Sequence, residues 1–327
     1  MRKMEILFLT REDVINTGIT HKEAMDTAID VLKEHGKKDF QNPPKLGVYL
    51  SDGFLNAMPA YLPGSNTIGV KWVSVFPGNP KLNVPSTMGL IILNDVKTGQ
   101  PVAIIDGGYI TAQRTAAASA VAAKYLANID SKVLGIVGTG EQACNHLLAL
   151  NDVLKEIEII KVYDRNKSIA QKFIATMGEK VSCQIVDSPS IEAVIRESDV
   201  VVTATGDLSG KPPIFMGQWL KDGVHVIPVH SHGWEFLALE NADKFIVDDW
   251  NQYSANFHID DYNPKLPPLY AELSEIILGK KKGREAKSEK IVSMHDGMAL
   301  HDIALASKAF KLAKEKGIGA TLKFMEY

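Results

Sequence analysis

The sequence predicts an α/β protein in which a parallel, doubly wound sheet is joined to a second, α+β domain. Three observations predict this fold class. Residues 131–164 contain an apolar strand, a glycine-rich turn, a helix and a second strand. The alternation of strands and helices then continues to about residue 247. The first hundred residues instead contain short strand-like runs separated by turns, which is typical of a mainly antiparallel sheet.

Length and composition limit the class of protein. A chain of 327 residues is long enough for two domains, and a net charge of −3 with 45% apolar residues provides no basic surface for nucleic acid. Because Cys144 and Cys183 are the only cysteines, we expect no disulfide framework and a reducing, cytoplasmic location. The apolar run at residues 6–9 is too short for a signal peptide or a membrane span, so no membrane partner is expected.

In the first third, residues 5–9 are predicted to form a strand. Thr10 with Asp13, and Thr20 with Glu23, have the spacing of helix N-caps. The second pair precedes a helix predicted at 21–35, which Gly36 is placed to end. Five further strands are predicted at 47–50, 54–61, 67–76, 87–93 and 102–106. An alanine-rich helix at 110–127 then leads into the next domain.

The glycine-rich turn has the sequence Gly138-Thr139-Gly140-Glu141-Gln142-Ala143, between a strand at 132–137 and a helix at 143–154. Gly138 permits a tight turn, Gly140 allows the backbone to approach a pyrophosphate, and Ala143 keeps helix and strand close. The free N–H groups at the helix start favour a phosphate. The pattern predicts a dinucleotide-binding unit, the alternative being an ordinary strand–helix turn.

An acidic residue follows the second strand, predicted at 157–162. Asp164 lies 24 positions beyond Gly140 and is placed to accept a hydrogen bond from a ribose 2′-OH, which favours NAD. Arg165, the next residue, could instead attract the 2′-phosphate of NADP. We therefore expect NAD as the cofactor and leave NADP open.

The remaining elements continue the pattern. Helices are predicted at 168–177, 190–197, 272–278 and 297–316, and strands at 199–205, 225–229, 245–247, 291–293 and 320–324. Since ligands bind at the carboxyl ends of parallel strands, Thr203, Thr205 and the segment 230–235 are expected beside the cofactor. The basic loop 279–290 is interpreted as a solvated surface. The last strand is expected to return to the first domain.

Three cations are candidates for binding a substrate anion. Lys71 lies between apolar neighbours, which fits an exposed strand face as well as a buried cation that binds a carboxylate or exchanges a proton. Arg114 is surrounded by small residues, and its partner is either a ligand carboxylate or a structural acid. Lys45 is a weaker candidate.

Histidines and acids occur in two further clusters. His230, His232 and Glu235 lack the ligand number and spacing of a zinc site, so we expect no metal. The second cluster, around the start of the last helix, consists of His295, Asp296, His301 and Asp302. We interpret these four as helix-capping and surface residues, with Asp296 as the capping candidate.

Together these segments resemble the ornithine cyclodeaminase/mu-crystallin family over nearly the whole chain. The pieces that carry the resemblance are LTREDV, NAMPAYLP, GVKWVSVFPGNP, VPSTMGLIILNDVKTGQPVAIIDG, ITAQRTAAASAVAAKYLA, GIVGTGEQA, VYDRN, VVTATG, KKKGRE and GMALHDIALA. The resemblance implies a Rossmann domain at 119–304 and a substrate-binding domain, which also forms a homodimer, at 1–118 and 305–327. It implies NAD(H) or NADP(H) chemistry at the α-carbon of an amino acid.

The resemblance also implies roles for individual residues. Lys71 and Arg114 match the family's carboxylate-binding groups, with Lys45 where an arginine is common and Ser86 at a pocket threonine. The chain departs from the family where Gly-Ala-Asp usually follows the strand at 225–229, because His232 stands in place of that aspartate. An imidazole holds a substrate ammonium poorly but can exchange a proton near neutral pH, which argues against ornithine cyclisation and makes His232 a candidate acid/base.

Three functions follow as expectations. The first is an NAD(P)-dependent amino-acid dehydrogenase or imine reductase. The second is a cyclodeaminase, in which NAD⁺ is reduced and reoxidised within each turnover. The third is a mu-crystallin-like binding protein, for which Trp72, Phe76 and Trp234 could line an apolar ligand site, although core packing explains these aromatic residues equally well.

Overall fold

The computed structural model describes residues 3–206, 208, 210–230, 232–257 and 259–326. The chain forms two compact units. Unit 1 consists of Met1–Arg114 and Met298–Tyr327, and unit 2 consists of Thr115–Gly297. Within the described ranges, no helix is both long enough and apolar enough to cross a membrane.

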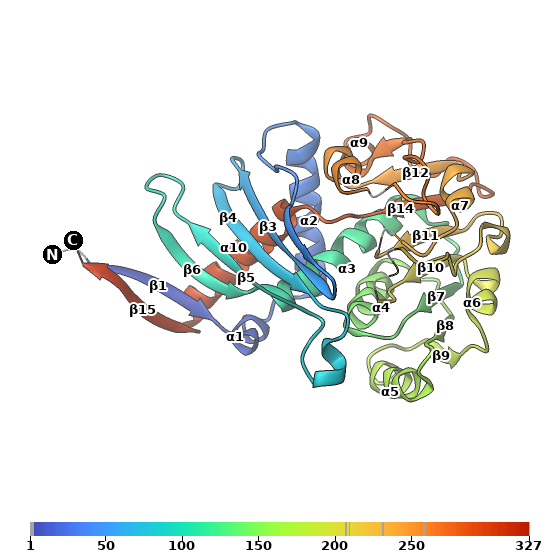
Figure 1. The fold of residues 1–327 in the computed structure, drawn as a ribbon, viewed down its shortest axis with the longest axis horizontal. Coiled ribbons are helices and arrows are strands. Elements are labelled where there is room, and N and C mark those ends of the chain that lie inside the picture. Colours follow the sequence, from blue (N-terminus) through green and yellow to red (C-terminus); the bar gives the residue numbers. More distant parts are fainter. Residues whose placement is uncertain (1–2, 207, 209, 231, 258, 327) are drawn as a thin grey trace. The chain divides into compact units, whose positions relative to one another are not determined.

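Unit 1 is built on a seven-stranded sheet with the order β15-β1-β6-β5-β4-β3-β2 (Figure 1). Among the strands that the structure describes here, β1 and β6 pair in parallel and the other pairs are antiparallel, which agrees with the predicted, mainly antiparallel sheet. The pairing of β15 with β1 confirms that the last strand returns to the first domain. The strands are β1 (Lys3–Leu9), β2 (Leu46–Leu50), β3 (Gly53–Leu62), β4 (Thr67–Val75), β5 (Thr87–Asn94), β6 (Pro101–Asp106) and β15 (Ala320–Glu326).

Among the described residues, three α-helices and a short 3-10 helix, η1 (Asn79–Leu82), lie entirely within unit 1. The α-helices are α1 (Arg11–Asn16), α2 (His21–Gly36) and α10 (Ala299–Lys316). Thr10 and Thr20 are the N-caps of α1 and α2, as predicted, and both helices start with a capping box, which was predicted only for Thr20. Gly317 ends α10 with a φ of 65°, a left-handed conformation that glycine adopts without strain. Helix α10 packs on β3 and β4, and α2 packs on α10.

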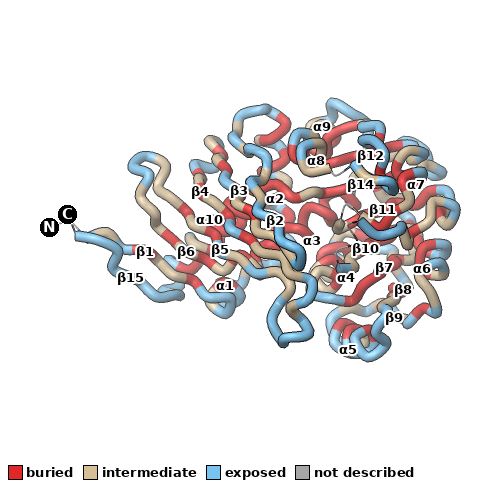
Figure 2. The backbone as a smooth tube through the Cα atoms, viewed as in Figure 1, coloured by how far each residue is buried: buried red, intermediate tan, exposed pale blue. Residues whose placement is uncertain are grey.

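The two faces of this sheet differ in burial. Figure 2 shows that its strands carry residues of all three burial classes. On β4, Lys71 and Val73 point to the inner face, which α10 covers, and both are buried. Trp72 points to the opposite, outer face and is 45% exposed. Strand alternation therefore separates an inner, helix-covered surface from an outer surface that retains exposed apolar side chains.

Unit 2 contains an eight-stranded parallel sheet with the order β13-β12-β14-β11-β10-β7-β8-β9. Its inner strands are buried along their whole length, as expected when helices cover both faces. The strands are β7 (Val133–Val137), β8 (Ile159–Tyr163), β9 (Gln184–Asp187), β10 (Val200–Thr203), β11 (His225–Pro228), β12 (Lys244–Val247), β13 (Ala271–Glu272) and β14 (Ile291–Met294). The predicted α/β class is confirmed.

The helices of unit 2 alternate with these strands. They are α4 (Glu141–Val153), α5 (Lys167–Gly178), α6 (Ile191–Glu197), η2 (Gly217–Trp219), α7 (Phe236–Glu240), α8 (Trp250–Asn256) and α9 (Leu273–Ile277). Helix α3 (Gly107–Leu126) begins in unit 1 and continues into unit 2.

The units divide at Arg114 and Gly297, whereas the family resemblance implied domain boundaries at 118 and 304. Because α3 is uninterrupted, no turn or composition change marks the first boundary.

Candidate functional site

Lys71 is buried on the inner face of unit 1 with 1% of its surface exposed. Its Nζ donates to Asp302 Oδ2 at 2.8 Å and lies 3.5 Å from Thr111 Oγ1. The sequence left an exposed strand face and a buried cation equally open for this residue. Burial with an acidic partner decides in favour of the buried cation.

Arg114 reaches the same acid from α3. Its Nε donates to Asp302 Oδ1 at 3.0 Å, and the side chain is largely buried. Asp302, on α10, has no exposed surface and uses one carboxylate oxygen for each cation. Lys71, Asp302 and Arg114, here called the buried triad, thus connect β4, α10 and α3 within unit 1.

Burial determines the charge state of the triad. The pKa of Lys71 is lowered from its ordinary value of 10.5 to about 7: burial is the largest cause, the positive charges of Arg114 and Lys45 act in the same direction, and Asp302 opposes them. Burial alone would raise the pKa of Asp302, but Arg114 and Lys71 outweigh burial and hold that pKa below its usual value. Two buried cations therefore share one carboxylate, which leaves excess positive charge suited to binding an anion.

The role of Asp302 was not predicted from the sequence. Asp302 and its neighbours were interpreted as helix-capping and surface residues. That interpretation is wrong, because His295, His301 and Asp302 are all buried. Asp296 does not cap α10 either: the N-cap is Met298, and Asp296 accepts a hydrogen bond from Asn256 Nδ2 at 2.9 Å. The available signal was an acid followed by Ile-Ala-Leu-Ala on a helix, since such a residue has no solvated face.

Lys45 and Ser86 lie at other positions in unit 1. Lys45 immediately precedes β2 and is half-buried, and its charge acts on Lys71. Ser86 immediately precedes β5, and its carbonyl accepts the Phe76 N–H at 2.7 Å. Lys45 thus contributes to the positive potential around the triad, while Ser86 acts through its backbone in bonding to Phe76.

In unit 2, the glycine turn has the predicted backbone. Gly138 has a φ of 86°, and a Cβ there would lie 2.5 Å from the carbonyl oxygen of Ala204, so the position requires glycine. Gly140 is the N-cap residue of α4, and a Cβ there would have no neighbour among the described atoms within 4 Å. Ala143 is fully buried against the sheet, as expected.

Asp164 ties the turn to the end of β8. Its Oδ2 accepts from the Thr139 backbone N and from Thr139 Oγ1, each at 3.0 Å, and its Oδ1 accepts from the Asn166 N at 2.8 Å. Arg165, Glu141 and Gly140 are exposed, and Gln142 is half-buried. The acidic residue, the turn and the start of α4 therefore form one connected surface.

This surface fits a dinucleotide. No side chain among the described residues caps α4, and its first backbone bond to the cap residue runs from the Cys144 N to the Gly140 O. The preceding N–H groups are those that a helix start leaves for an anion. The open position at Gly140 gives a pyrophosphate access to them.

Thr203 and Thr205 follow the carboxyl end of β10. Thr203 Oγ1 accepts from Trp234 Nε1 at 3.1 Å, and Thr205 is half-buried in the following loop. His232 is half-buried after β11 and interacts electrostatically with Asp260. Part of the segment 230–235 lies outside the described residues, namely Ser231.

The aromatic residues considered for an apolar ligand belong to different units and have different surroundings. Trp72 is on the outer face of the unit 1 sheet, and Phe76 is half-buried after β4. Trp234 belongs to the core of unit 2, with its ring 5.1 Å from that of Phe215. Core packing therefore accounts for Trp234, and the aromatic residues give no support for an apolar ligand site.

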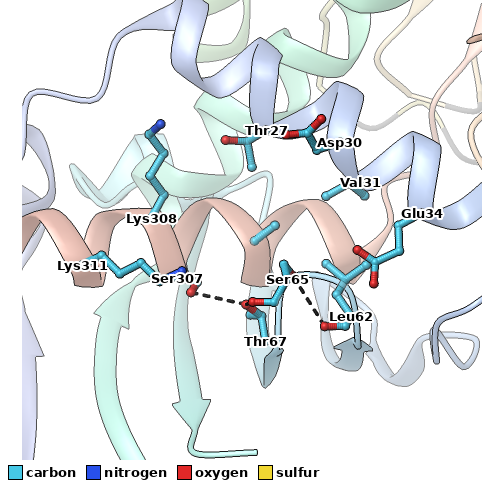
Figure 3. A pocket seen from close by; sticks show the side chains of 11 residues that line it. Thr27, Asp30, Val31, Glu34, Leu62, Ser65, Thr67, Ser307, Lys308 and Lys311 are labelled. Atoms are coloured by element: carbon cyan, nitrogen blue, oxygen red, sulfur yellow. Dashed lines mark hydrogen bonds between the residues drawn. The ribbon is translucent and has the colours of Figure 1, made fainter.

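A separate pocket of about 250 Å³ lies in unit 1 between α2, the β3–β4 turn and α10 (Figure 3). A contact between Thr67 Oγ1 and Ser307 Oγ, 3.4 Å apart, crosses it. Its lining residues are Thr27, Asp30, Val31, Glu34, Leu62, Ser65, Thr67, Ala304, Ser307, Lys308 and Lys311. None of the residues predicted for substrate or cofactor is among them.

Comparisons with known proteins identify the family to which the chain belongs. The sequence profile of the ornithine cyclodeaminase/mu-crystallin family matches residues 4–317. Alanine dehydrogenase of Archaeoglobus fulgidus is 35% identical over 330 residues, which cover 98% of this chain and 99% of that protein. N-((2S)-2-amino-2-carboxyethyl)-L-glutamate dehydrogenase of Staphylococcus aureus is 30% identical over 335 residues, covering 97% and 98%.

Among solved structures, the Δ1-pyrroline-2-carboxylate reductase of Thermococcus litoralis, in complex with NADH and L-proline, is similar throughout. It has a TM-score of 0.86 and 33% sequence identity, and the match covers 96% of this chain and 99% of that chain.

Proposed function

The chain belongs to the ornithine cyclodeaminase/mu-crystallin family, and we propose that it is an NAD-dependent oxidoreductase acting at the α-carbon of an amino acid or its imine. The observation that carries the proposal is the buried triad of unit 1, in which Lys71 and Arg114 share the single acid Asp302. Together with the open glycine turn of unit 2, this triad supports a substrate that carries a carboxylate and a cofactor that carries a pyrophosphate.

The cofactor is NAD, which when bound supplies the nicotinamide C4 that accepts or donates a hydride. Gly138, Gly140 and the first N–H groups of α4 would hold the pyrophosphate, and Asp164 would bind the ribose hydroxyls in exchange for part of its bonding to Thr139. The remaining contacts are assigned by position to Glu141, Gln142, Ala143, Arg165, Thr203 and Thr205. Exposed Arg165 is the feature that would permit NADP.

The substrate carboxylate would bind to Lys71 and Arg114. A guanidinium binds carboxylates through paired N–H groups, and the fixed bond to Asp302 holds Arg114 in position before substrate arrives. Lys45 adds positive charge, and Ser86 is assigned by position to the edge of the same site. Preorganised cations of this kind favour negative charge on the substrate without further rearrangement.

Two residues are proposed for proton exchange with the substrate. Lys71 is suited because its pKa of about 7 makes both protonation states available near neutral pH. His232 is the second candidate, as an imidazole in place of the family's aspartate. We do not assign the cyclodeaminase reaction, because a histidine there binds a side-chain ammonium poorly.

A substrate screen tests the proposal. Amino acids, keto acids with ammonium or amines, and cyclic imines are offered with NAD(H) and with NADP(H), and absorbance is followed at the reduced-nicotinamide band. The proposal predicts net oxidation or reduction of the nicotinamide with at least one substrate. Ammonia release without net NADH would instead indicate a cyclodeaminase. Tight binding of an apolar ligand with no turnover would indicate a mu-crystallin-like binding protein.

We propose that the chain acts as a cytoplasmic homodimer. Its two cysteines are free thiols, which fits a reducing compartment. The outer face of the unit 1 sheet supports dimerisation, because Trp72 and Leu90 are paired across β4 and β5 and both are exposed. Trp72→Glu should convert the protein to a monomer in light scattering; an unchanged mass would place the contact elsewhere.

A further inference from the structure

Asn56 is a buried polar residue whose side-chain oxygen has no role in holding the described parts of the fold together. It lies on β3 with 8% of its surface exposed, and its Oδ1 has no hydrogen-bond partner among the described residues. Unpaired buried acceptors are uncommon because the group loses its bonds to water and gains nothing in return. The other buried side chains of this strand, those of Met58, Ala60 and Leu62, are apolar.

The sheet register places Asn56 beside the buried triad. Asn56 is paired with Val73 on β4, and the next pair on the same face of the sheet is Met58 with Lys71. Asn56 and Lys71 are therefore diagonal neighbours on the inner face, a relation that typically places two residues about 7–8 Å apart. Both side chains extend from the same surface, so a small molecule held by the ammonium of Lys71 lies within reach of the amide.

The residues paired with one another across β2, β3, β4 and β5 at the level of Asn56, here called the Asn56 row, carry few side chains. The Asn56 row consists of Gly47, Asn56, Val73 and Gly89, so only an amide and an isopropyl group project from it. Helix α3, which carries Arg114, begins next to this row, because a Cβ on Gly107 would lie 3.0 Å from the backbone carbon of Gly89. Asn56 is therefore on the side of Lys71 from which Arg114 approaches.

We propose that the Asn56 carboxamide binds the α-nitrogen of the substrate while Lys71 and Arg114 bind its carboxylate. In an amino acid or an iminium the α-nitrogen carries an N–H, and Asn56 Oδ1 is an acceptor that needs one. A 2-keto acid has no donor at that atom. The inference rests on the proposed function and narrows it: the site selects substrates with nitrogen already on the α-carbon, so preformed imines are preferred to free keto acids.

The test replaces Asn56 with leucine, a residue of similar size that needs no hydrogen bond. We expect kcat/KM for the preferred imine or amino acid to fall by about 10- to 100-fold, the effect of losing a hydrogen bond to a charged donor. The dissociation constant for NADH should stay within about twofold, because Asn56 contacts substrate rather than cofactor. The melting temperature should rise, since an unpaired polar atom has been removed.

The control and the second variant keep the test decisive. Thr67→Val alters another buried polar residue of the same inner face, at the opposite end of β4, and should leave kcat/KM unchanged. If the leucine variant does not fold, Asn56→Ala is measured in the same way. Unchanged kcat/KM in a folded variant would overturn the inference. A wild type that turns over no substrate of the panel would instead overturn the proposed function, so the two failures are distinguishable.

Discussion

Asp302→Asn is the most informative substitution in the buried triad. The amide keeps the size and shape of the side chain but removes the one negative charge that, among the described residues, pairs with both Lys71 and Arg114. Asp302 is also the group that raises the pKa of Lys71 against burial. Without that charge, the pKa of Lys71 falls below about 7, and the variant holds a neutral lysine at neutral pH.

The size of the effect on folding stability follows from the pKa of Lys71. The fall from 10.5 to about 7 corresponds to roughly 5 kcal/mol by which the buried ammonium already opposes folding. This cost is present in full below pH 7 and is lost as the pH rises from about 7 toward 10.5, because the unfolded lysine keeps its proton over that range. Removing the only counter-charge of such a site typically costs about 3–5 kcal/mol more.

The pH dependence gives the assay. In the variant, Lys71 releases its proton at lower pH. At pH 8.5 Lys71 is neutral in both folded proteins, so it lowers the free energy of unfolding equally in both. At pH 6 it lowers the free energy of unfolding more in the variant than in the wild type. Urea unfolding should therefore show a larger loss of stability at pH 6 than at pH 8.5. The KM for the substrate should rise at least about tenfold at pH 7, because a cation has been lost from the carboxylate site.

Asp130→Asn is the matched control. Asp130 is also paired with a lysine, Lys287, but both side chains are exposed, so stability and KM should not change measurably. A pH-independent stability difference for Asp302→Asn, together with wild-type KM, would refute the reasoning that Asp302 sets the charge state of Lys71.

Further predictions concern both units. Arg114→Lys should raise KM about tenfold or more in steady-state assays, because an ammonium cannot reproduce the paired N–H groups; an unchanged KM would remove Arg114 from the site. Substrate affinity should fall as pH rises through about 7, where Lys71 loses its proton, and this inflection should be missing from the KM–pH profile of Lys71→Met. Gly138→Ala should unfold unit 2 at a lower temperature, because its Cβ would contact the Ala204 carbonyl at 2.5 Å with a φ of 86°. Gly140→Ala should melt like the wild type but bind NADH more weakly in calorimetry; normal NADH affinity would show that the cofactor does not approach this turn.

Much of the fold could be predicted because its segments carry strong local signals. The buried strands β10 and β14, the capping box of α2 and the Gly138 turn follow from local sequence alone. Elements such as β9 and α7 were missed, because their four or five residues show no period and lack the continuous run of β-branched residues that marks β10.

The candidate site was only partly predictable from the sequence. Lys71 and Arg114 were recognisable as cations among apolar and small neighbours, but Asp302 lies 188 positions beyond Arg114 and meets it only through the packing of α10 on the sheet. Sequence spacing also gave no indication that Asp164 accepts the bonds of Thr139, or that Asn56 lies diagonal to Lys71. These relations depend on tertiary packing and strand register.

The most direct test of the central claim is isotope transfer from the cofactor. The protein is incubated with NADH carrying deuterium at C4 and with the best imine of the substrate panel, and the amino-acid product is analysed by mass spectrometry and NMR. We predict deuterium at the α-carbon of the product, delivered from one face of the nicotinamide. An α-carbon that carries only hydrogen would contradict the assignment of this protein as an oxidoreductase acting at that atom.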